Sequence, residues 1–102
     1  MKVRKRLYVI TEEDIYQACA KAQVDLGLRL RSLRKAEKLS IAKLASMSGV
    51  NHSVLGDIER GRGNPRFATL FKLSQSLGIE LEQLFSSDAS TFNEGDPSRK
   101  IR

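Results

Sequence analysis

The sequence has little of several residue types: one cysteine, one histidine, no tryptophan, two tyrosines and four phenylalanines among 102 residues. Cys19 cannot form a disulfide within the chain, and together with a single histidine it cannot build a zinc site. No apolar run reaches the roughly eighteen residues of a transmembrane helix. Residues 1–10 include basic side chains but lack the apolar core of a signal peptide. These absences predict a cytoplasmic protein without a metal site or a disulfide.

Residue groups that carry out catalysis are also missing. The sequence shows no Cys/His pair, no carboxylate dyad at a plausible spacing and no phosphate-binding glycine loop. His52 and Ser53 are adjacent, and adjacent residues of a helix do not face each other. We therefore expect no enzymatic activity and no cofactor.

Basic residues outnumber acidic ones, 18 to 12, which gives a formal net charge of +6. The excess lies in residues 1–10 and in residues 26–85, whereas residues 11–25 are mainly acidic. A surface that faces the phosphates of a nucleic acid would explain this distribution, and so would ordinary solubility. Charge alone does not decide between the two.

Residues 1–25 form an arm and a helical extension. Charged and apolar side chains alternate over residues 3–10, which indicates either a short strand in need of a partner or an extended arm. Thr11 is an N-cap residue, and apolar side chains at helical spacing follow it. The helix either runs unbroken to about Ala36 or breaks near residues 25–27, because glycine inside a helix costs about 1 kcal/mol.

Residues 26–85 carry the signals of five short helices joined by short connections. Residues 86–102 are polar and have too little apolar surface to fold alone, so we expect a disordered tail. The predicted fold class is therefore all-α. After the first helix, the expected helices span residues 40–46, 51–60, 67–77 and 80–85.

The helices at residues 40–46 and 51–60 are separated by a tight turn that contains Gly49, and Asn51 stands in the cap position of the second. Two helices joined in this way are typical of a helix-turn-helix, whose second helix enters the major groove of DNA. Here the sequence resembles the Xre-type helix-turn-helix family of phage repressors, Cro proteins and restriction–modification controllers. The matching segments are residues 26–34, 39–45, 48–51, 55–61, 64–65 and 70–79.

The resemblance implies a five-helix, repressor-like DNA-binding domain at residues 26–85, in a bacterial or phage regulator of transcription. It implies that residues 51–60 enter the major groove of double-stranded DNA, at the nucleoid, and that repression results from occupying a promoter. Two alternatives stay open: an antitoxin, or a bridging protein. The main contact of either would be another protein, through residues 1–25 in the first case.

Within the second helix of the motif, the resemblance implies base contacts from His52, Ser53 and Asp57. The competing interpretations are a solvated surface side chain for His52 and a helix-start preference for Ser53. Val54 could touch a thymine methyl group or simply pack. Asp57 could accept a hydrogen bond from cytosine N4, or it could pair with Arg60 three residues on and never touch DNA. We favour the pair.

Side chains that flank this helix are candidates for contacts to the DNA backbone. Two positions depart from the family: Ile41 stands where glutamine usually binds phosphate, and Arg66 replaces a small cap residue. The resemblance also implies a structural ion pair between Arg34 and Glu59. The candidates for backbone contacts are Ser40, Lys43, Asn51, Arg60, Arg62, Asn64 and Arg66.

A homodimer is expected, because one recognition helix reads about half a site and proteins of this kind bind two half-sites about one DNA turn apart. Residues 81–85 and residues 7–22 are the candidate dimer surfaces. We favour residues 7–22, since Leu7, Val9 and Ile15 need burial that a small core does not supply.

Overall fold

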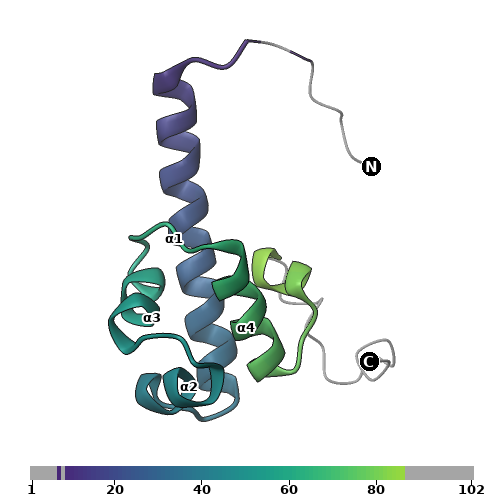
Figure 1. Cartoon of the computed structure of the whole chain (residues 1–102). Coiled ribbons are helices and arrows are strands. Elements are labelled where there is room, and N and C mark those ends of the chain that lie inside the picture. The colour runs from purple at the N-terminus through teal and green to yellow at the C-terminus, as the bar shows by residue number, and fades with distance from the viewer. Residues whose placement is uncertain (1–6, 8, 87–102) are drawn as a thin grey trace.

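The computed structural model describes Leu7 and residues 9–86, and within this part the chain is all-α (Figure 1). The expectation of five α-helices is wrong for residues 80–85, where the last element is a 3-10 helix, and the first helix begins at Glu12, as in the continuous alternative that the sequence left open. The elements are four α-helices and one 3-10 helix: α1 (Glu12–Ala36), α2 (Ile41–Ser48), α3 (His52–Glu59), α4 (Phe67–Leu77) and η1 (Leu81–Phe85).

Two sequence predictions fall largely outside the described residues. Of the strand expected at residues 3–10, only Leu7, Val9 and Ile10 are described, and none of them is in a strand. Of the tail expected at residues 86–102, only Ser86 is described. None of the helices in the described part is long and apolar enough to span a membrane.

Helix α1 starts from a strong local signal and continues without a break. The side-chain oxygen of Thr11 accepts a hydrogen bond from the backbone N–H of Asp14 at 3.1 Å, and acidic residues in the first turn suit the positive end of the helix dipole. The other end of the helix lies in the core, with Leu30 and Leu33 buried. The N-terminal part stands clear of the other helices, and residues 11–22 are exposed (Figure 1).

Gly27 lies inside α1 because two helices touch there. A Cβ atom at this position would lie 2.8 Å from the backbone oxygen of Glu59 and even closer to that of Ile58. The missing side chain thus lets the end of α3 pack directly on α1, and this packing offsets the helix propensity that glycine lacks. The alternative that the sequence left open is decided in favour of one continuous helix.

The core is aliphatic and forms between α1 and the other elements. Helix α1 packs against α3 and η1, α2 packs against α3 and α4, and η1 also packs on α4 (Figure 1). Five leucines at its centre are completely inaccessible to solvent, and each contributes roughly 1.5–3 kcal/mol of burial. They are Leu30, Leu44, Leu55, Leu73 and Leu84.

The last element is 3-10 because its hydrogen bonds close over three residues. The N–H of Gln83 bonds to the carbonyl of Glu80 at 3.0 Å, and the Gln83 side chain bonds back to the N–H of Glu80 at 2.9 Å. The carbonyl of Gln83 accepts a hydrogen bond from Nε of Arg29, at 2.8 Å, so this turn is tied to α1. Hydrogen bonds that close over three residues define a 3-10 helix, which spans Leu81–Phe85.

Candidate nucleic-acid interface

The turn between α2 and α3 is held by caps at both of its ends. Gly49 ends α2 with a left-handed φ of 75°, which glycine adopts without strain. Asn51 then starts α3: its side-chain oxygen accepts hydrogen bonds from the N–H groups of Ser53 at 2.7 Å and Val54 at 3.4 Å. These local bonds set the angle at which α3 leaves the turn.

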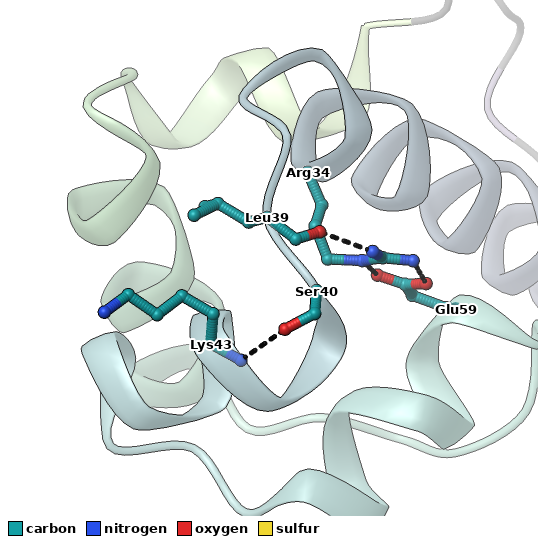
Figure 2. A network of polar contacts seen from close by, with 5 residues as sticks. All are labelled: Arg34, Leu39, Ser40, Lys43 and Glu59. Carbon is teal, nitrogen blue, oxygen red and sulfur yellow. Dashed lines mark hydrogen bonds and ion pairs between the residues drawn. The ribbon is translucent and has the colours of Figure 1, made fainter.

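A buried ion pair locks the inner side of α3 to α1. The guanidinium of Arg34 forms a two-pronged contact with the carboxylate of Glu59, at 2.7 Å and 2.9 Å (Figure 2). The same guanidinium donates a third hydrogen bond, at 2.7 Å, to the carbonyl of Leu39, in the segment that leads into α2 (Figure 2). One side chain therefore joins α1, α3 and the connection between α1 and α2.

The surroundings of this pair make the loss of either partner costly. Only 8% of the Arg34 side chain and 3% of the Glu59 side chain are exposed, so solvent does little to screen their charges. The hydrogen bond to Glu59, aided by its charge, raises the pKa of Arg34, although burial opposes the shift. The structure thus brings together the two residues for which the resemblance implied a structural pair.

The outer side of α3 presents polar side chains. Leu55, Ile58 and Glu59 are buried, and by helical spacing the opposite side carries Ser53 and Asp57. His52, Ser53 and Val54 are exposed at the N-terminal end of the helix. The four candidates for base contacts therefore belong to one short stretch of helix, with Asp57 one turn after Ser53.

Asp57 forms the pair with Arg60 that the sequence offered as one of its two roles. Its carboxylate accepts a hydrogen bond from Nη2 of Arg60 at 2.9 Å, and both side chains are about half exposed. The pair is therefore open to solvent and, taken alone, contributes little to stability.

The candidates for backbone contacts lie on both flanks of α3. Before it, the side-chain oxygen of Ser40 accepts a hydrogen bond from the N–H of Lys43 at 3.0 Å, and the Lys43 side chain is exposed (Figure 2). After it, Arg62, Asn64 and Arg66 are exposed in the loop that leads to α4. The side chain of Arg66 makes no cap hydrogen bond to α4.

The loop at residues 61–65 is fixed from two sides. The N–H of Arg62 bonds to the carbonyl of Asp57 at 2.9 Å, and the side chain of Gln23 donates a hydrogen bond to the carbonyl of Gly63. Sequence reasoning did not single out Gln23, and it could not have done so, because its partner lies 40 residues away. Among the described residues, no group of three His, Cys, Asp or Glu side chains could hold a metal ion.

Comparison with known proteins identifies the family to which this motif belongs. The family model described as helix-turn-helix matches residues 30–84, which include α2, α3, α4 and most of η1. Among curated proteins, the chain is 35% identical over 63 residues to the immunity repressor protein of Bacillus phage phi105, covering 62% of this chain and 44% of that protein. It is 44% identical over 59 residues to the HTH-type transcriptional repressor RghR of Bacillus subtilis, covering 57% of this chain and 44% of RghR. The chain thus spans less than half of each relative.

Two solved structures have a similar fold, and the match to one of them covers nearly all of that chain. The restriction–modification controller protein C.AhdI from Aeromonas hydrophila is 43% identical, with a TM-score of 0.61, and the match covers 62% of this chain and 96% of that one. An HTH_3 family transcriptional regulator from Vibrio cholerae is 32% identical, with a TM-score of 0.65, over 72% of this chain and 41% of that one.

Proposed function

The chain belongs to the helix-turn-helix family whose model it matches, the Xre-type family that its sequence resembles, and we propose on this premise that it is a sequence-specific DNA-binding repressor of transcription. The observation that carries the proposal is the mounting of α3: one side is locked by the buried pair of Arg34 and Glu59, while the other presents polar side chains to solvent. Two similar proteins are themselves named repressors.

In the proposed complex, α3 lies in the major groove. His52, Ser53 and Val54, at its N-terminal end, face base edges, and the exposed cations on either side meet phosphates. Ser40 and Lys43 lie on one flank of α3, with Asn51 at its start, and the other flank carries Arg62, Asn64 and Arg66. When the protein is bound in this way at a promoter, it represses transcription by occupying the site.

The test is a salt series. We expect binding to a sequence selected from a random DNA library to weaken steeply with salt, with a slope of about −0.9 for each phosphate contacted. Arg62→Ala should lower affinity about equally for all sequences and reduce the slope by about 1, whereas His52→Ala should relax the choice of base. Lys72→Ala, which removes a charge from the exposed side of α4, serves as the control and should change neither.

A flat salt dependence together with the absence of any selected sequence would contradict the DNA-binding proposal. A toxin-sized protein that co-purifies in stoichiometric amount would then favour an antitoxin.

We further propose that the protein is a homodimer held together by the exposed part of α1. Ile15, Cys19 and Ala22 continue, turn by turn, the side of α1 that is buried at Leu26 and Leu30, yet they are exposed. A helical segment of this length without tertiary contacts is only marginally stable in water. Pairing with the same segment of a second copy would bury this stripe and place the two α3 helices for two half-sites.

Substitutions on the two sides of α1 test this dimer, because only one side carries the proposed interface. We expect Ile15→Asp combined with Ala22→Asp to give a monomer in light scattering, because each buries a charge in the proposed interface. Deletion of residues 1–22, which removes the whole stripe, should have the same effect. Gln17→Asp, on the opposite side of α1 by helical spacing, is the control and should stay dimeric. A dimer that survives the stripe variant would locate the interface elsewhere.

A further inference from the structure

Arg60 begins at the end of α3, but its charged group does not stay there. The guanidinium lies back over Gly56, about one turn earlier: a Cβ atom at Gly56 would sit 3.3 Å from both terminal nitrogens and 3.6 Å from Cζ. Gly56 is buried although it lies on the outer half of the helix. The guanidinium therefore lies against the position that a Cβ atom at residue 56 would take, closer than an ordinary contact would allow.

Asp57 keeps the guanidinium in this place. Its carboxylate binds Nη2 of Arg60 at 2.9 Å. The loop after α3 approaches Asp57 from the other direction, since a Cβ atom at Gly63 would lie 3.5 Å from the Cβ of Asp57 and the N–H of Arg62 bonds to its carbonyl. Asp57 thus lies between the loop and the guanidinium that it holds.

These residues share the side of α3 that faces away from the core. Counted from Ser53, the next three residues of this side lie three, four and seven positions on: Gly56, Asp57 and Arg60. This spacing places them on one helix face, and the buried Leu55 and Ile58 lie on the other. The guanidinium consequently sits near the middle of the outer face, where base edges would lie, and not at its end, where a phosphate would lie.

We propose that Arg60 reads a guanine in the major groove, and that Gly56 and Asp57 are the positioning residues that place its guanidinium for this task. The inference rests on the proposed function and assigns Arg60 a base contact in place of the backbone contact expected from the sequence. An arginine can donate two hydrogen bonds to O6 and N7 of guanine, and it has five N–H donors, so the bond to Asp57 leaves enough of them.

The pairing also explains why an acidic residue is tolerated on this face. Asp57 and Glu59 are the acidic residues of α3, and Glu59 is buried, so Asp57 alone would present a negative charge to DNA. An unpaired carboxylate among phosphates would be repelled, whereas one bound to Arg60 is locally neutral. Its charge then orients the arginine.

The experiment compares discrimination with overall affinity. Wild-type protein selects its site from a random DNA library, and binding is then measured for that site, for versions with one base pair changed, and for random DNA over a salt series. Arg60→Lys keeps the charge but loses the two-pronged geometry. It should retain the salt slope and the affinity for random DNA while losing about 10- to 100-fold discrimination at one guanine.

Two further variants test the positioning roles. Gly56→Ala places a methyl group 3.3 Å from the terminal nitrogens of the guanidinium, so the guanidinium must shift and discrimination at the same guanine should fall. Thermal stability should be kept or raised by the better helix propensity of alanine. Asp57→Asn should reduce discrimination at the same base pair. It should also raise the affinity for random DNA, because it removes a negative charge. Arg31→Lys makes the same change at an exposed arginine of α1 outside the candidate contacts, and as the matched control it should leave discrimination unchanged.

The outcomes separate the inference from the function on which it rests. If the wild type selects a site and Arg60→Lys discriminates as well as the wild type, the guanine contact is overturned while DNA binding stands. The same holds if Arg60→Ala weakens binding equally for every sequence, since a phosphate contact would do that. If the wild type selects no sequence and shows no salt dependence, both proposals are overturned.

Discussion

Replacing Glu59 with alanine is expected to lower the free energy of unfolding by about 3–5 kcal/mol, the usual cost of breaking a buried ion pair by removing one partner. Arg34 is only 7% exposed and would keep its charge without the carboxylate that now meets two of its nitrogens. Loss of the Arg34–Glu59 contact should also disturb the candidate nucleic-acid interface, because this contact joins α3 to α1. DNA affinity should fall together with stability.

Urea unfolding at a fixed protein concentration measures the effect, since a dimer makes stability depend on concentration. Asp57→Asn is the matched control: it breaks an ion pair of similar length, 2.9 Å, that is about half exposed, and it should cost less than about 1 kcal/mol. If both variants lost the same small amount of stability, burial would not be what makes the Arg34–Glu59 pair strong.

Gly27→Ala is expected to destabilise the fold even though alanine is the better helix former. The added Cβ would lie 2.8 Å from the carbonyl oxygen of Glu59 and 3.0 Å from its carbon, and backbone atoms cannot swing aside as a flexible side chain can. Helix α1 and the end of α3 would have to separate. We expect a net loss of about 1–3 kcal/mol, the usual cost of overpacking a well-packed site.

Thermal unfolding of two glycine variants isolates this effect. Gly56→Ala makes the same chemical change inside a helix, but its new methyl group meets only the flexible end of Arg60 at 3.3 Å. It should unfold at the wild-type temperature or above, whereas Gly27→Ala should unfold several degrees lower. Equal melting temperatures for the two variants would mean that the close approach of α1 and α3 is not needed for stability.

Much of the fold could be predicted because its signals are local. Thr11 and Asn51 were recognised as caps, and each accepts a hydrogen bond from an N–H group two or three residues on. Gly49 was recognised as a stop and adopts the left-handed conformation that suits glycine. Such signals act within one turn of helix, so the order of residues contains them.

The errors and open points concern energies that depend on distant partners. The helix at residues 80–85 was expected to be α-helical, but it closes over three residues, and its carbonyl at Gln83 is bound by Arg29 from α1. Gln23, which holds the loop at residues 61–65 through the carbonyl of Gly63, carries no local pattern. The sequence left two roles open for Asp57, and only the position of the Arg60 side chain shows that the pair forms.

The sequence by itself determined an all-α chain, the helix-turn-helix at α2 and α3 and, through a family resemblance, the pairing of Arg34 with Glu59. Caps, turn glycines and apolar spacing are properties of neighbouring residues, and they do not depend on the rest of the chain. The tertiary structure alone decided that α1 passes through Gly27 without a break, because that choice rests on its contact with α3. It also decided that the guanidinium of Arg60 lies over Gly56, because rotamers of exposed side chains are set by the partners that surround them.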